Sequence, residues 1–245
     1  MAKPSFETIL CDTAEARSIN YQLRYQVYYR ETDLEGPNGL SDGKDRDKYD
    51  KHSVHFVARN PSNRQWVAAM RLVLAGRGVL PLEKFFNIEP VPENLPIRHT
   101  IVEFSRFCVL QSHRRHNRNR GLDLKVIDGR SGEMKIARSD PGYPDIMLGL
   151  INATFEWSRK HDVRYCYFLI TRTLARTLQR MGMELRPAGE PAEHHGLRTP
   201  HIMDLRESEY GMKCNLPLFR EISRQTAPYR HYSGLNKKSL STTMA

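Results

Sequence analysis

The chain has 245 residues, enough for a sizeable core within one α/β domain. Its 39% hydrophobic and 27% charged residues are ordinary for a globular protein, and no apolar run reaches the length of a membrane span. The first residues carry no apolar signal core, so we expect a cytoplasmic protein. The excess of 38 Lys and Arg over 28 Asp and Glu gives a formal charge of +10 and favours an acidic partner. Nucleic acid, anionic lipid, a phosphorylated cofactor and an acidic carrier protein all remain compatible with that charge.

The four cysteines lie far apart, without the paired spacing of a metal site or a disulfide framework. They are Cys11, Cys108, Cys166 and Cys214. Three of them stand in apolar surroundings, which indicates buried thiols in a reducing compartment. We therefore expect neither a bound metal nor a structural disulfide.

Residues 5–11 predict a first strand, and an N-cap at Asp12 or Thr13 begins a helix that continues to about residue 30. The polar, glycine-containing residues 31–51 predict a long loop. Long ordered loops in compact domains are often functional, although an exposed charged loop is the plain alternative. Residues 53–59 and 65–75 alternate around a turn and predict a hairpin whose second strand contains Arg71.

A short helical piece at 81–86 and a proline-rich approach lead to residues 100–110, the most informative stretch of the chain. This run of β-branched and aromatic residues predicts a buried strand, yet it contains Glu103 and Arg106. A structural ion pair at a sheet edge is the alternative to a functional role. The two-residue period of a strand predicts one face with Glu103, Ser105 and Phe107, and an opposite face with Phe104, Arg106 and Cys108.

The second half begins with a basic run over residues 111–121 and a stretch of little periodicity to residue 144, which we interpret as an insertion or mobile lid. Helix 146–160, strand 164–170, helix 171–181, strand 183–187, loop 189–195 and strand 199–205 are then predicted. Residues 206–224 are ambiguous but helical in composition. We expect one domain over residues 1–227 and a disordered tail over 228–245.

This order of elements resembles the GNAT acyltransferase fold, an α/β (α+β) fold with a central, mixed, twisted sheet flanked by helices. Four short motifs are similar to those of acyl-homoserine-lactone (autoinducer) synthases, in the same order along the chain. They are Arg24-Tyr-Gln-Val-Tyr28 in the first helix, Asp45-x-Asp47-x-Tyr49-Asp50 in the acidic loop, Arg71-Leu72 in the hairpin and Glu103-Phe-Ser-Arg-Phe107 in the charged strand.

The C-terminal half, with residues 174–182 and 196–200, is more similar to acyltransferases associated with PEP-CTERM/exosortase gene clusters and to N-acyl amino acid synthases. The chain also departs from the autoinducer synthases. Leu34 stands where those enzymes have a tryptophan that helps to form the S-adenosylmethionine site. The resemblance therefore implies acyl transfer to a small amine, and Leu34 favours an acceptor other than S-adenosylmethionine.

Transfer of an acyl group from a thioester to an amine needs a neutral amine and a polarised carbonyl. Glu103 is the candidate general base, and Ser105 and Arg106 complete the candidate catalytic set of the charged strand. A backbone N–H at the splayed end of that strand would hold the oxyanion, as in GNAT enzymes generally. No bound cofactor is expected, since the acyl-phosphopantetheine thioester is a co-substrate.

Six further residues are candidates for binding the acceptor. Asp47 and Asp50 suit a cationic group. The planar guanidinium groups of Arg24, Arg71 and Arg106 suit either these acids or a substrate carboxylate. In the alternative interpretation, these acids and arginines only fix the long loop to the sheet. The set is Arg24, Tyr28, Asp45, Asp47, Asp50 and Arg71.

The basic run lies where GNAT enzymes bind the phosphopantetheine arm, but it contains Gly121 alone rather than a glycine-rich phosphate loop. An acyl carrier protein presents one phosphodiester and an acidic surface, so it is the expected donor ahead of acyl-coenzyme A. A solvated basic loop is the alternative. The candidate donor-binding residues are Arg114, Arg115, Arg118 and Arg120.

The leading hypothesis is an N-acyltransferase that moves a fatty acyl chain from acyl carrier protein to an amino acid or a similar small amine. An acyl-homoserine-lactone synthase is the alternative within the same class. A basic nucleic-acid-binding module would explain the charge but would leave Glu103, Asp47 and Asp50 without a role. A GNAT scaffold without activity also fits the sequence.

Overall fold

The computed structural model describes residues 6–32, 42–88, 98–114, 127–128, 134–135, 143–224 and 227–235. The strands are β1 (Glu7–Leu10), β2 (Ser53–Arg59), β3 (Trp66–Leu74), β4 (Ile101–Val109), β5 (Ile127–Asp128), β6 (Met134–Lys135), β7 (Tyr165–Ile170), β8 (Leu185–Pro187), β9 (Ala192–Glu193), β10 (Leu197–Asp204) and β11 (Arg230–His231). The α-helices are α1 (Ala14–Tyr25), α2 (Gln111–Arg114), α3 (Tyr143–Lys160), α4 (Arg172–Arg180), α5 (Leu205–Asn215) and α6 (Pro217–Ser223).

A mixed sheet organises the molecule, with its strands in the order β11-β1-β2-β3-β4-β7-β10-β8 and with β9 added beside β10. Neighbouring strands run antiparallel except at β1–β11 and at β4–β7. The strands β4 and β7 are parallel because α3 connects them across one face of the sheet. The predicted hairpin of β2 and β3 is confirmed, and so is the predicted mixed α/β architecture.

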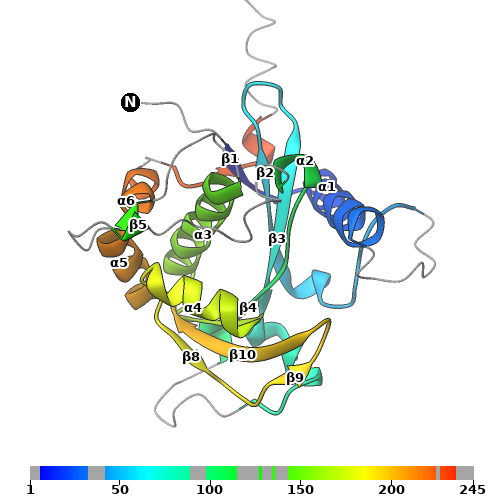
Figure 1. Ribbon diagram of the computed structural model, residues 1–245. Coiled ribbons are helices and arrows are strands. Elements are labelled where there is room, and N and C mark those ends of the chain that lie inside the picture. The colour runs from blue at the N-terminus through cyan, green and yellow to red at the C-terminus, as the bar shows by residue number, and fades with distance from the viewer. Residues whose placement is uncertain are drawn as a thin grey trace, which may run out of the picture.

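Helices cover both faces of the sheet (Figure 1). Helix α1 lies on one face, over β2 and β3, while α3 lies on the opposite face together with α5 and α6. The main core lies between the sheet and α3 and includes Met70, Leu72 and Phe155, which are at most 2% exposed. None of the helices within the described part of the chain is long and apolar enough to cross a membrane.

Helix α1 begins at Thr13, whose side chain accepts a hydrogen bond from the backbone N–H of Ala16. Leu23 of α1 and Val27, just after it, pack against the sheet as the sequence predicts. After Tyr25 the chain continues as a wider π-helical turn over Gln26–Glu31. π-Helical turns are rare in proteins overall, and those that occur are often found at functional sites. The turn carries Tyr28 toward the end of β4, where its hydroxyl donates to the Phe107 carbonyl at 3.0 Å.

Strand β4 contains a bulge that overturns the predicted alternation of its side chains. Its pairing with β3 shifts register after Ser105, and Arg106 has a positive φ of 53°. Ser105 contacts Arg71 on the α1 face, and Arg106 follows on that same face beside Asp45. Phe107 therefore packs on the α3 face against Phe104 and Tyr143. The prediction that Phe107 shares a face with Glu103, and Arg106 a face with Phe104, was wrong because a bulge adds one residue to the repeat.

The chain after α5 also differs from the predictions. The ambiguous region 206–224 forms α5 and α6, and the predicted loop 189–195 contains β9. The tail predicted to be disordered includes β11, which pairs in parallel with β1, and Tyr232 is only 8% exposed. Order therefore extends to Leu235, because aromatic side chains in this segment pack against the edge of the sheet. The last ten residues of that tail lie outside the described residues.

Candidate active site

Two buried arginines and three aspartates form a polar network on the α1 face. The Arg24 Nε atom lies 2.9 Å from Asp45 Oδ2, and its Nη1 atom lies 2.7 Å from Asp50 Oδ1. Arg71 Nη1 lies 2.7 Å from Asp47 and 2.8 Å from Asp50. The side chains of Arg24 and Arg71 are 0% and 2% exposed. The predicted acceptor-binding residues are thus close together, but their charges mainly neutralise one another.

Asp50 is the centre of this network. Burial opposes its ionisation, but the hydrogen bond from His55 and the charges of Arg24 and Arg71 outweigh burial and hold the pKa of this carboxyl far below its usual range. His55 Nε2 lies 3.0 Å from Asp50 Oδ1, and burial lowers the pKa of that histidine. The ring is therefore a neutral donor at physiological pH. His55 was not among the predicted site residues, since it occurs singly in an ordinary strand pattern.

Asp47 and Arg106 are the members of the network that reach the surface. Their side chains are 24% and 25% exposed, and Arg106 Nη2 lies 3.7 Å from Asp47 Oδ2. The Arg106 guanidinium also lies 5.4 Å from the centre of the Tyr28 ring and 3.3 Å from Asp45. These contacts place the exposed end of the network at the bulge of β4.

Glu103 is separate from the network and is only 4% exposed. Its carboxylate accepts a hydrogen bond of 2.9 Å from the backbone N–H of Leu82. Burial raises the pKa of Glu103 to about 8, although this hydrogen bond and the charge of Arg71 oppose the shift. A carboxyl with this pKa exchanges a proton near neutral pH, which is the range required of a general base.

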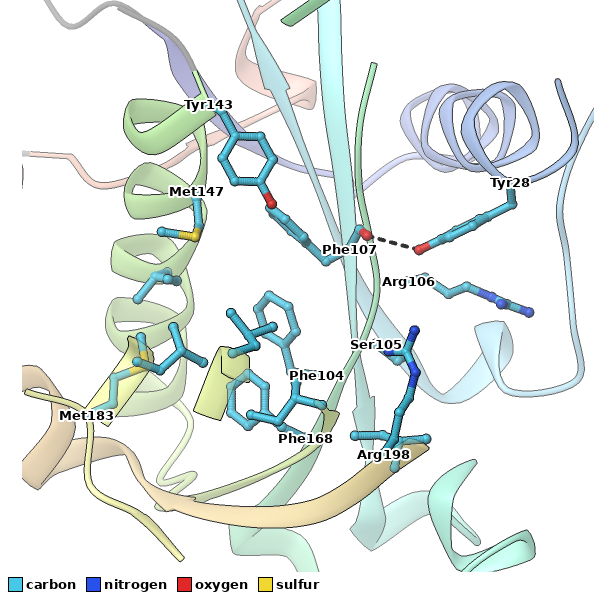
Figure 2. Close-up of a pocket in the computed structure, with 15 residues that line it drawn as sticks. Tyr28, Phe104, Ser105, Arg106, Phe107, Tyr143, Met147, Phe168, Met183 and Arg198 are labelled. Carbon is cyan, nitrogen blue, oxygen red and sulfur yellow. Dashed lines mark hydrogen bonds between the residues drawn. The ribbon is translucent and has the colours of Figure 1, made fainter. Parts of the chain in front are cut away.

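A cavity of about 300 Å³ opens where β4 and β7 diverge. The two strands pair only as far as Phe104 and Phe168, so β4 beyond that point has no β7 residue beside it. The interior is apolar and the mouth is polar (Figure 2). The cavity is lined by Tyr28, Phe104, Ser105, Arg106, Phe107, Tyr143, Met147, Ile151, Phe168, Leu169, Ile170, Leu174, Leu178, Met183 and Arg198.

Ser105 connects this cavity with the polar network. Its hydroxyl oxygen accepts a 3.0 Å hydrogen bond from Arg71 Nε, and its side chain lines the cavity mouth. All three predicted catalytic residues lie on the α1 face of β4, but only Ser105 and Arg106 line the cavity, and Glu103 does not. The sequence could not show the position of Arg106 because that position depends on the bulge.

The predicted donor-binding run is described only at its start. Arg114 is paired with Glu31, whose carboxylate also accepts from the backbone N–H of Gln111 at 2.7 Å. Arg115, Arg118 and Arg120 lie outside the described residues. Among the described residues, no group of three or more histidines, cysteines or acidic residues is placed to hold a metal ion.

A second basic surface lies on α4 and was not predicted. Its outer face presents Arg172, Arg176 and Arg180, all exposed, while its inner face places Leu174 and Leu178 in the cavity wall. Arg176 and Arg180 also line a shallow hollow with Thr173 and Gln179. The four-residue spacing of the three arginines is visible in the sequence and would have indicated a basic helical face.

Comparison with known proteins agrees with this fold. Residues 23–122 match the family described as "Acetyltransferase (GNAT) domain". No curated protein matches the chain. Among solved structures, the chain is similar to BjaI, described as a coenzyme A-dependent acyl-homoserine lactone synthase, with 17% identity and a TM-score of 0.62 over 93% of this chain and 92% of BjaI.

Two further solved structures share the arrangement. TofI, crystallised with an inhibitor and MTA, has 16% identity and a TM-score of 0.59 over 84% of this chain and 96% of its own. FeeM, an N-acyl amino acid synthase from uncultured soil microbes, has 9% identity and a TM-score of 0.52 over 85% and 96%. The chain therefore has the GNAT-like fold of these synthases, which confirms the predicted resemblance at the level of fold.

Proposed function

We propose that the protein is an N-acyltransferase that moves a fatty acyl chain from a phosphopantetheine thioester to the amine of an amino acid or a similar small molecule. The observation that carries this proposal is the junction at the end of β4. There an apolar cavity on the α3 side meets a partly exposed carboxylate and guanidinium on the α1 side. An acyl chain needs the first environment, and a charged amine needs the second.

In the proposed reaction, the acyl chain lies among Phe104, Phe168 and Met147, with the thioester carbonyl at the point where β4 leaves β7. The amine nitrogen attacks the carbonyl carbon, so that a C–N bond forms and the C–S bond breaks. Before attack, Glu103 takes one proton from the ammonium, directly or through one water, and the proton that the nitrogen loses on becoming an amide passes to the departing thiolate, which leaves as a thiol. Backbone N–H groups of β4 beyond Phe104 hold the oxyanion.

We further propose acyl carrier protein as the donor. The α4 helix supports this choice because its inner face lines the cavity while its outer face exposes Arg172, Arg176 and Arg180. An acidic carrier docked on that face would present its thioester at the cavity mouth. Coenzyme A is the competing donor, and BjaI is described as dependent on it.

The acceptor is best tested by letting candidate amines compete. The purified protein is incubated with a long-chain acyl carrier protein pool, or with the matching acyl-coenzyme A set, plus the twenty amino acids and S-adenosylmethionine. Mass spectrometry should detect an N-acyl amino acid and the free carrier thiol. A homoserine lactone accompanied by methylthioadenosine would instead show that the alternative within this class is correct. If no acylated amine forms with either donor, the proposal is wrong.

A further inference from the structure

A second arginine besides Arg106, Arg198, lines the cavity mouth and has no role so far. It stands near the start of β10, across the opening from the charged strand β4. In β10 the next residue, Thr199, pairs with Ile170, the last residue of β7. Arg198 is therefore one residue beyond the end of β7, beside the gap that opens between β4 and β7. In Figure 2 its side chain rises from β10 toward Ser105.

The guanidinium of Arg198 lacks the partners that occupy the other arginines of the site. Arg24 and Arg71 are buried and paired with aspartates, and Arg106 is paired with Asp45 and Asp47. Within the described part of the chain, Arg198 has no acidic partner. Its Nη2 atom makes one long contact of 3.4 Å, to the His195 carbonyl. Its Nε atom is enclosed by protein and has no hydrogen-bond partner there.

An enclosed donor without a partner is unusual in folded proteins and calls for a ligand or another explanation. We propose that Arg198 determines acceptor specificity by binding the carboxylate of an α-amino acid. This inference rests on the proposed N-acyl transfer and deepens it. A planar guanidinium binds a carboxylate through two parallel hydrogen bonds. A carboxylate held there places the neighbouring amine near Ser105 and Arg106, where β4 separates from β7.

This assignment replaces the predicted use of Arg24, Arg71 or Arg106 for a substrate carboxylate. Binding at any of those three would require an existing ion pair with an aspartate to break, and two of them are inaccessible. Arg198 needs only to exchange a weak contact with a carbonyl for a charge-assisted pair. The acidic network then has a different task, which is to hold Arg106 and Ser105 in place.

The test compares acceptors that differ only in the carboxylate. The best amino acid from the competition assay is measured against its decarboxylated amine and its primary amide, with wild type, Arg198→Ala and Arg198→Lys. Wild type should prefer the carboxylate. In Arg198→Ala, kcat/KM for the amino acid should fall about ten- to hundredfold, the usual scale for a lost charge-assisted pair. The value for the decarboxylated amine should change less than about threefold, and Arg198→Lys should be intermediate.

Arg186→Ala is the matched control, because Arg186 is an exposed arginine on the adjacent strand β8 and does not line the cavity. It should leave both acceptors unaffected. Equal losses for all acceptors in Arg198→Ala, or a rise in the KM of the acyl donor alone, would overturn the inference in favour of a structural or donor-binding role. A wild type that acylates decarboxylated amines as well as amino acids also overturns it, while the proposed acyl transfer stands. A wild type that acylates no amine removes both proposals.

Discussion

The two faces of the sheet at the end of β4 differ in whether their side chains leave space for a ligand or pair with one another. On the α3 face, Phe104 and Phe107 border a cavity whose apolar walls leave space. On the α1 face, Arg24, Arg71 and Asp50 fill the available space and bond to one another. The first face can accept a ligand as it stands, whereas most of the second face is already occupied by its own charges. The motif residues of the α1 face therefore act mainly as a frame for the few groups that reach the mouth.

One residue produces the contact between these two environments. The bulge at Arg106 places Ser105 and Arg106 consecutively on the α1 side and returns Phe107 to the α3 side. Without that extra residue, Arg106 would point into the apolar cavity without a carboxylate partner. A non-glycine residue with positive φ is uncommon and is often retained at functional sites.

The largest effect is expected from Glu103→Gln, which tests whether the general base comes from the α1 face of the sheet. The amide keeps the shape of the side chain but cannot take a proton, so turnover should fall about 10²- to 10⁴-fold. In wild type, kcat/KM should rise with pH until the Glu103 carboxyl, with its pKa of about 8, is ionised. A variant that keeps more than about a tenth of wild-type turnover, when chemistry limits the rate, would contradict the assigned role.

The same substitution has a stability signature that is independent of activity. Burial raises the pKa of Glu103 from 4.5 to about 8, so the folded state binds this proton more tightly than the unfolded state. The free energy of unfolding should therefore fall as pH rises from about 4.5 through 8, by an amount on the order of a few kcal/mol. Glu103→Gln should remove that slope. Urea titrations of both proteins at pH 6 and pH 9 provide the measurement.

The frame itself is tested by Arg24→Met, which removes the guanidinium and leaves Asp45 and Asp50 buried with fewer partners. We expect a loss of about 3–5 kcal/mol in the free energy of unfolding, the usual cost of breaking a buried pair. Arg30→Met, at an exposed position of the following π-helical turn, should change it by less than about 0.5 kcal/mol. Similar unfolding curves for the two variants would show that the network does not stabilise the fold.

Much of this frame was predictable because its motifs are short and local. The spacing of Arg24 in a helix and of Arg71 and Glu103 in strands, together with the resemblance, predicted a group of residues that the structure places close together. Their burial was less predictable, because it depends on how Asp45 and Asp50 fold back from the loop onto α1. The sequence therefore indicated a substrate site where the structure shows a self-neutralising network.

The cavity side was less predictable, and the reason is geometric. The cavity mouth requires a bulge at Arg106. No glycine stands at that position to indicate a positive φ in the sequence. The mouth also needs Arg198, which reaches it only because β10 extends past the end of β7. Pairing between strands distant in sequence decides both features, and periodicity within one strand does not report it.

The proposed role of the apolar cavity in holding the acyl chain is tested by a substitution that reduces the cavity volume. Ile151→Phe on α3 adds volume to the cavity wall and should select against long acyl chains. The ratio of kcat/KM for long over short donors should fall about tenfold, the scale of one or two methylenes in an apolar pocket. Leu218→Phe on α6, which packs on the same core but does not line the cavity, is the matched control. An equal fall in kcat/KM for long and short donors would indicate a folding defect rather than a shortened cavity.

The smallest effect concerns the outer surface of α4, which would guide the donor to the apolar side. Changing Arg172, Arg176 and Arg180 to Gln together should raise the KM for acyl carrier protein about threefold, because exposed charges contribute as little as about 0.2 kcal/mol each. Turnover at saturation should be unaffected. Association with the carrier should also lose most of its dependence on salt, since steering by exposed charge is screened.

Two comparisons decide how this docking result is interpreted. Acyl-coenzyme A, which has no protein surface to dock, should respond less to the triple α4 change than acyl carrier protein does. The sequence-predicted patch of Arg114, Arg115, Arg118 and Arg120, changed to Ala, provides the competing variant. Arg114 is already paired with Glu31, so part of any effect there would come from loss of that contact with the π-helical turn. If only the second variant weakens carrier binding, the donor docks on the basic run and α4 serves only as a wall of the cavity.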